Sequence, residues 1–155
     1  ELRGEKTAEE FETLIDVKIN AYIPSSYIYS EEQKLEMYKR ISEIKSENDF
    51  LDVQDELLDR FGEVPECVQN LLDIAILKSN AHRIGVVSII QKNENIVIKF
   101  KPDSDADVSK LLEAVKNSDK KLLLSGGETP YLTYKTDNSD NKFITNINKL
   151  MKELQ

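Results

Sequence analysis

Two helices and the turn between them are encoded in residues 55–86, DELLDRFGEVPECVQNLLDIAILKSNAHRIGV. The first helix is expected to start near position 48 and to end with Phe61. Gly62 stops it, because glycine accepts the left-handed backbone of a helix end without steric cost. Pro65 starts the next helix in its first turn, where the missing N–H breaks no intrahelical bond. That helix is apolar on nearly all sides up to Gly85, which predicts the central buried helix of the domain.

Upstream of these helices, Ser30 and Gln33 have the spacing of a capping box and predict a helix that ends near Ser46. Before it, the segment DVKINAYIP (residues 16–24) alternates apolar and polar residues and predicts a half-buried strand that Pro24 ends. Residues 1–15 are mostly polar and are expected to be a linker from a preceding region, with the domain itself spanning residues 16–155.

Downstream of Gly85 the pattern changes to strands. The runs 86–91 and 96–101 predict one hairpin, and the runs 122–124 and 131–134 predict a second. A helix starting near Val108 separates them, and a last helix carries an apolar stripe over residues 143–154. The predicted fold class is therefore α+β, with an N-terminal part of three helices followed by a small antiparallel sheet of hairpins with two further helices.

The composition excludes several classes of protein. The 155 residues carry 21 Lys and Arg against 29 Asp and Glu, a net charge of −8, which argues against direct nucleic-acid binding because that depends on cations neutralising phosphates. The single Cys67 excludes an internal disulfide. The longest apolar run, Ile74–Leu77, is far too short to cross a membrane. No signal peptide is present, so a cytoplasmic protein that does not contact membranes is expected.

The residues offer little for catalysis or metal binding. Cys67 and His82 lie on the same predicted helix, about 22 Å apart along its axis, so they cannot form a dyad. A packed thiol and a cation at a helix C-terminus are the simpler roles. Asp103, Asp105 and Asp107 have the first spacings of a calcium loop but lack its later glycine and glutamate, so helix capping is expected instead. We therefore expect no enzyme activity, no metal and no cofactor in this chain.

One helix face stands out because its acidic residues form a stripe. On a helical wheel, the helix preceding Gly62 places these apolar residues on one side: Phe50, Val53, Leu57, Leu58 and Phe61. Asp52, Glu56 and Asp59 follow one another on the other side, with Asp55 beside them. Like charges at this spacing destabilise a helix slightly, and Arg60 is the only cation nearby. The pattern alone favours a solvated face, with an arginine-bearing partner as the alternative.

The ordered strings AYIPSSYI, KLEMYKRISEIKSENDF and the stretch quoted at the start resemble the C-terminal domain of bacterial transcription-repair coupling factors, the Mfd or TRCF family. The most specific parts are YIP at 22–24, YKRI at 38–41, and ELLDRFG followed by VP across 56–65. The resemblance covers about residues 16–87. Beyond them the chain shows only a compatible pattern of hairpins and helices.

The resemblance implies a non-catalytic, autoinhibitory protein-interaction domain. In this family an ATP-dependent double-stranded DNA translocase removes stalled RNA polymerase and recruits nucleotide excision repair. Its C-terminal domain packs on a UvrB-like module and masks the surface that binds UvrA. This chain has no Walker A sequence, so ATP and Mg would belong to the parent translocase, and residues 1–15 would form the end of its preceding translocase region.

The resemblance also assigns roles to single residues. Glu56 and Asp59 match acidic residues that face the UvrB-like module, which favours partner binding over solvation at these two positions, with Asp52 and Asp55 as weaker neighbours. The other matching residues have structural roles: Arg60 pairs with Glu56, Phe61 is a core ring, Gly62 and Pro65 end and start helices, and Tyr22 and Pro24 strap the chain to the helical core. The alternative is a free-standing acidic adaptor domain that binds another basic protein.

Overall fold

We describe the fold from a computed structural model, which describes residues 11–104, 106–126, 129–136 and 143–155. In these residues the element order is β1(Leu14–Asp16), α2(Glu31–Ser42), α3(Glu47–Phe61), α4(Glu66–Arg83), β2(Val86–Lys92), β3(Asn95–Phe100), α5(Val108–Asn117), β4(Leu122–Ser125), β5(Tyr131–Lys135) and α6(Phe143–Glu153). The predicted α+β class, with three helices followed by hairpins and two further helices, is confirmed.

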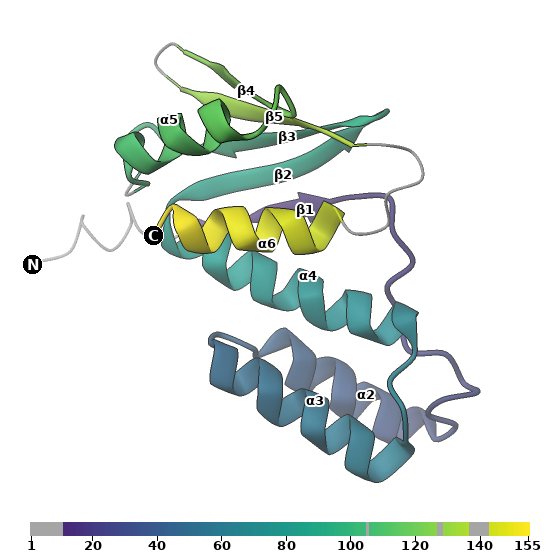
Figure 1. Cartoon of the computed structure of the whole chain (residues 1–155). Coiled ribbons are helices and arrows are strands. Elements are labelled where there is room, and N and C mark those ends of the chain that lie inside the picture. The colour runs from purple at the N-terminus through teal and green to yellow at the C-terminus, as the bar shows by residue number, and fades with distance from the viewer. Residues whose placement is uncertain (1–10, 105, 127–128, 137–142) are drawn as a thin grey trace, which may run out of the picture. The chain divides into compact units, whose positions relative to one another are not determined.

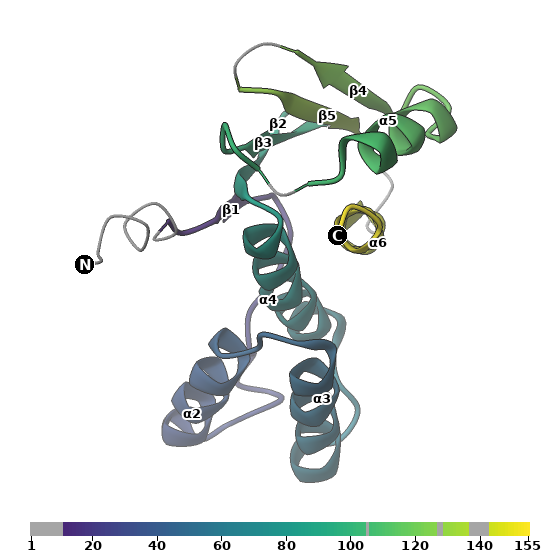
Figure 2. The same cartoon turned by 90° about the vertical axis from the view of Figure 1, so that its left-hand side faces the viewer.

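The chain divides into a helical unit, residues 18–80 and 143–153, and a sheet unit, which contains the remaining described residues. In the helical unit, α2, α3 and α4 enclose a core whose most buried members include Met37, Leu57 and Leu72. Figure 2 shows α2 and α3 beside each other, with α4 drawn above them. Ser30 caps α2, its Oγ accepting from the backbone N–H of Gln33 at 3.3 Å, as the capping-box spacing predicts.

The last helix, α6, belongs to the helical unit although it is distant in sequence from α2–α4. Asn148 Nδ2 donates to the carbonyl oxygen of Asp73 in α4 at 3.1 Å, and Lys152 pairs with Glu47 of α3 at 3.0 Å. Burial raises the pKa of the Asp73 carboxyl, while a hydrogen bond from Gln69 opposes that shift. These contacts attach a C-terminal helix to residues that lie 75 and 105 positions earlier in the chain.

The sheet unit is built on five strands in the order β1-β2-β3-β5-β4 (Figure 1). The two predicted hairpins are present: β2 pairs antiparallel with β3, and β4 pairs antiparallel with β5. Asp107 caps α5, its Oδ1 accepting from the backbone N–H groups of Ser109 and Lys110. This is the capping predicted for the acidic run before that helix, of which Asp105 lies outside the described residues.

The strand predicted at residues 16–23 is wrong. The strand lies earlier, at Leu14–Asp16, where it pairs in parallel with β2 at the edge of the sheet. Thr13, directly before it, is buried and donates from its Oγ1 to the carbonyl oxygen of Val86 at 2.7 Å. The alternation that suggested a strand reflects instead an extended segment in the helical unit, where Ile23 is buried while Tyr22 is exposed. In the described part of the chain, no helix is long and apolar enough to cross a membrane.

Candidate functional site

The acidic stripe lies on α3, a helix with well-defined ends. Ser46 is its N-cap and accepts from the backbone N–H of Asp49 at 3.1 Å, which satisfies one of the free donors of the first turn. At the other end, Gly62 has a φ of +93° and donates its N–H to the carbonyl oxygen of Leu58 at 3.1 Å. Val53 and Leu57 are buried in the helical core. These contacts set which face of α3 turns outward.

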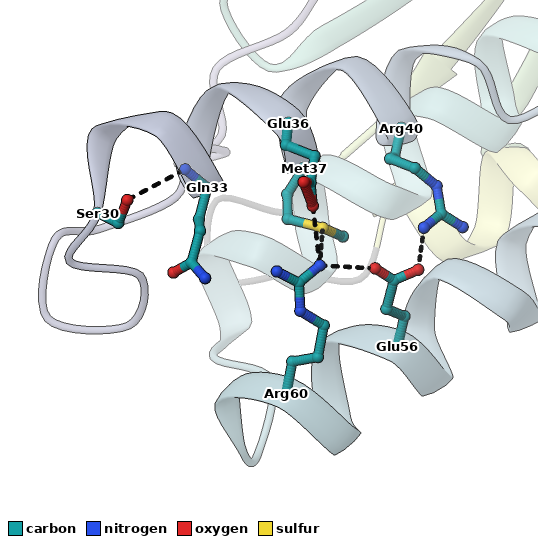
Figure 3. Close-up of polar contacts among 7 residues, drawn as sticks. All are labelled: Ser30, Gln33, Glu36, Met37, Arg40, Glu56 and Arg60. Carbon is teal, nitrogen blue, oxygen red and sulfur yellow. Dashed lines mark hydrogen bonds and ion pairs between the residues drawn. The ribbon is translucent and has the colours of Figure 1, made fainter.

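Glu56 does not lie on the outward face of α3. Its carboxylate points towards α2, which supplies a second arginine besides Arg60 (Figure 3). Arg40 of α2 donates to Glu56 Oε1, and Arg60 donates to Glu56 Oε2 at 2.8 Å. The same Arg60 nitrogen reaches Oε1 of Glu36 at 2.8 Å. Only 25% of the Glu56 side chain is exposed. The expectation that Arg60 is the only cation near the stripe is therefore wrong, since Arg40 lies sixteen residues away in sequence.

The Arg60 and Phe61 side chains connect this ion network to the core. The guanidinium of Arg60 lies 5.0 Å from the centroid of the Phe61 ring, a cation–π distance, and Phe61 packs beside Tyr27. Tyr27 Oη donates towards the carbonyl oxygens of Leu57, at 3.1 Å, and Gly62, at 2.8 Å. Burial raises the pKa of that phenol. The last turn of α3 is thus held on one side by the ion pairs of Arg60 and on the other by the hydrogen bonds of Tyr27.

The remaining carboxylates of the stripe face solvent. Asp52, Asp55 and Asp59 are all exposed. None of their side chains forms an ion pair or hydrogen bond with another residue in the described ranges. The four predicted partner-binding residues therefore separate into one that is neutralised inside the domain and three whose charges are available to a partner.

Two leucines share the outward face with these carboxylates. Leu58, predicted to lie on the buried side, is 52% exposed, and Leu51 is 46% exposed. The prediction for Leu58 is wrong because the buried side of α3 is the one that carries Val53 and Leu57, and Leu58 is turned about 100° away from Leu57. Leu51, Asp55 and Leu58 have the spacing i, i+4, i+7, which places them on one helix face. That spacing is the signal in the sequence that could have identified Leu51.

The YIP segment lies across the helical core through backbone contacts. The backbone N–H of Tyr22 donates to the carbonyl oxygen of Cys67 at 3.2 Å, and that of Ile23 donates to Tyr38 Oη at 2.8 Å. The carbonyl oxygen of Pro24 accepts from the backbone of Tyr27 and Ile28. Pro65 precedes α4, and its carbonyl oxygen accepts from the N–H groups of Val68 and Gln69. These residues hold the helices in place around the α3 face.

Cys67 and His82, the candidate nucleophile and base, contact different residues and not each other. Cys67 is half-buried against the core of the helical unit. His82 stacks on the Phe11 ring at 4.4 Å between centroids, with its Nε2 2.8 Å from the Phe11 carbonyl oxygen. Within the described residues, no group of three or more His, Cys, Asp or Glu side chains is arranged to hold a metal ion.

Comparison with known proteins relates this chain to one family. The TRCF domain model matches residues 17–111. The chain is 36% identical over 100 residues to the transcription-repair-coupling factor of Bacillus subtilis, and 30% identical over 151 residues to that of Staphylococcus aureus. These matches cover 64% and 96% of the chain, but only 8% and 12% of the respective relatives.

The fold has also been solved before. A crystal structure of the C-terminal domain of transcription-repair coupling factor superposes with a TM-score of 0.85 and 25% sequence identity, covering 93% of this chain and 92% of that one. The predicted resemblance is confirmed, and it extends past residue 87 into the sheet unit. The chain belongs to the TRCF domain family and corresponds to the C-terminal domain of the transcription-repair coupling factors.

Proposed function

We propose that this chain is a non-catalytic regulatory domain that docks on the UvrB-like module of its parent protein and covers the surface that binds UvrA. The parent would be an ATP-dependent DNA translocase that displaces stalled RNA polymerase, with ATP, Mg²⁺ and DNA bound elsewhere in that protein. Support comes from the family of the chain and from the α3 face. The chain carries a net charge of −8, which suits a basic protein surface better than a phosphate backbone.

The observation that carries the proposal is a set of exposed carboxylates on α3, at Asp52, Asp55 and Asp59, that have no ion-pair partner in the described part of the chain. Uncompensated charges on one helix face favour a partner that bears arginines, because the guanidinium can bind two carboxylate oxygens at once. A domain joined to its partner in one polypeptide needs only weak intrinsic affinity, since a short linker gives effective concentrations in the millimolar range. A small acidic face is therefore enough for a reversible contact.

Release of such a contact is a shift between closed and open forms. A ligand opens the protein only as far as it binds the open form more tightly than the closed form. Polymerase, or DNA with ATP, would supply this difference by engaging parts of the parent that are accessible in the open form. The apparent affinity for UvrA would then measure the fraction of the protein that is in the open form.

The test is charge reversal at Asp55 and Asp59 in the full-length factor, with UvrA affinity as the readout. Asp55→Lys plus Asp59→Lys should weaken the closed form and raise the affinity for UvrA. Glu56 is left unchanged, because a lysine between Arg40 and Arg60 would disrupt the packing of α2 against α3 as well as any partner contact.

The matched control reverses two exposed carboxylates of the sheet unit, Glu12→Lys plus Glu113→Lys, which changes the net charge equally. This control should leave UvrA affinity unchanged. If the α3 variant and the control bind UvrA with the same affinity as the unmodified factor, the domain does not mask UvrA through α3.

A further inference from the structure

We infer that α3 binds its partner through a mixed face, with Leu51 and Leu58 as the apolar centre and Asp52, Asp55 and Asp59 as the charged rim. This inference rests on the proposed function and adds the chemistry of the contact. The partner surface must have an apolar depression bordered by arginine or lysine side chains. A purely basic surface would leave the two leucines against polar groups.

The geometry of α3 brings the two kinds of side chain together. Leu51 and Leu58 are separated by two helical turns, about 10 Å along the axis. Asp55 lies between them on the same face, four residues after one leucine and three before the other. Asp52 and Asp59 follow each leucine by one position and line the same edge. The face is therefore one continuous strip, in which the two leucines lie on one side and the carboxylates lie beside them.

The leucines are not needed for the core of the domain. Val53 and Leu57, on the inward side of α3, are almost completely buried, whereas half of each of the two leucines remains in water. A single exposed leucine is ordinary in a soluble protein. Two on one helix face, beside three carboxylates that have no partner among the described residues, form the kind of apolar patch with a polar rim that marks protein interaction sites.

Glu56 has a different role from its neighbours. Its two oxygens are already occupied by Arg40 and Arg60, so a partner arginine could reach it only by displacing one of them. Arg60 is in turn held by Glu36 and by the Phe61 ring. We therefore assign Glu56 as a positioning residue that fixes α3 against α2 and so sets the direction of the mixed face.

The two kinds of side chain should contribute differently to binding. Buried leucines at the centre of an interface slow dissociation and are insensitive to salt. Rim carboxylates speed the encounter with a basic partner, and their effect is screened as ionic strength rises. Binding should therefore keep a part that salt does not remove.

The experiment titrates this 155-residue chain calorimetrically with the separately expressed UvrB-like module of its parent, at low and at moderate salt. Three forms are compared with the unmodified chain. Leu51→Ala plus Leu58→Ala removes the apolar centre, and Asp55→Asn plus Asp59→Asn removes two rim charges without changing shape. Leu35→Ala plus Leu112→Ala is the matched control, because these leucines are also exposed but lie on other helices.

We expect the Leu51/Leu58 variant to bind at least about tenfold more weakly at both salt concentrations, because two leucine side chains no longer bury their exposed apolar surface. The Asp55/Asp59 variant should lose affinity mainly at low salt, and the control should bind like the unmodified chain. Circular dichroism should show unchanged folding for every variant, because all the altered side chains are exposed.

The outcomes separate this inference from the function on which it rests. If the unmodified chain binds the module and the Leu51/Leu58 variant binds equally well, the apolar centre is refuted while the proposed docking stands. Equal loss in the Leu35/Leu112 control would also refute it, since the effect would not be specific to α3. If the unmodified chain does not bind at either salt concentration, the proposed function fails and this inference fails with it.

Discussion

At the scale of single residues, neighbouring carboxylates on one helix have different environments. Glu56 lies between two guanidinium groups, whereas Asp55, one position earlier, has no partner in the described structure. One step along a helix turns a side chain by about 100°, which is enough to exchange contact with α2 for contact with water. The candidate site is therefore defined by the direction in which each side chain points, and not by residue type alone.

The two glycines at helix ends allow a direct test of backbone strain. Gly62 and Gly85 have φ values of +93° and +86°. A Cβ at Gly62 would meet nothing within 4 Å, whereas one at Gly85 would lie 3.1 Å from Lys101 and from Ser104. Gly62→Ala should lower the free energy of unfolding by about 1–3 kcal/mol through strain alone. Gly85→Ala should lower it further, because steric overlap is added to the same strain.

Urea unfolding of the two alanine variants measures this difference. The contrary outcome is that Gly85→Ala proves no more destabilising than Gly62→Ala. Lys101 and Ser104 would then move aside without a cost in free energy, and the close packing around Gly85 would not contribute to stability.

At the scale of elements, α3 has two faces with different environments. The inward face packs against α2 and α4 through Val53 and Leu57, and the ion network joins it to α2 (Figure 3). The outward face carries the leucines and free carboxylates. Because the inward contacts are fully used within the domain, the outward face can be changed without altering the fold.

This division predicts that neighbouring substitutions differ in their effect on stability. Glu56→Gln should lower the free energy of unfolding by about 1 kcal/mol, because Arg40 and Arg60 lose a charged acceptor in a partly exposed network. Asp55→Asn should change it by less than about 0.5 kcal/mol, since Asp55 forms no ion pair with a cation among the described residues. High salt should reduce the effect of Glu56→Gln.

Chemical denaturation at two salt concentrations checks these values. Asp55→Asn is the matched control, as it removes the same charge from the same helix. Equal stability of the two variants would mean that the Arg40–Glu56–Arg60 network does not hold α3 against α2, and Glu56 would then regain a place on the partner-binding face.

At the scale of the whole molecule, each unit is assembled from both ends of the chain. The helical unit takes α6 from the C-terminal region, and the sheet unit takes β1 from the N-terminal region. In α6, Phe143, Ile144, Ile147, Leu150 and Met151 are all buried. Each buried apolar side chain of this size contributes about 1.5–3 kcal/mol. The combined contribution of these five side chains is comparable with the net free energy of unfolding of a typical protein, about 5–15 kcal/mol.

A chain that ends at residue 142 should therefore not fold cooperatively at 37 °C. The measurement is circular dichroism during urea unfolding, and the control is a chain that lacks only Gln155, which is exposed. Ile147→Ala should fold and lose about 2–5 kcal/mol, which gives a graded second measurement. A cooperative transition in the chain without α6, with a midpoint like that of the control, would show that α6 is dispensable.

The amino-acid sequence determined the elements whose signals are local. Ser30, Gly62, Pro65 and Asp107 mark helix ends, because capping and backbone preferences act within a few residues. The two hairpins follow from alternation on either side of short turns. The short ordered motifs around Gly62 were also sufficient to identify the family.

Only the tertiary structure decided what depends on distant contacts. β1 pairs with a strand 74 residues later, so its position cannot be found from its own alternation, as Leu14↔Ser88 shows. Leu58 is exposed because other side chains fill the core first, and Glu56 is neutralised by Arg40 from another helix. The reason is physical: local preferences choose the element, but the face that an element buries is chosen by competition among all the surfaces that pack together.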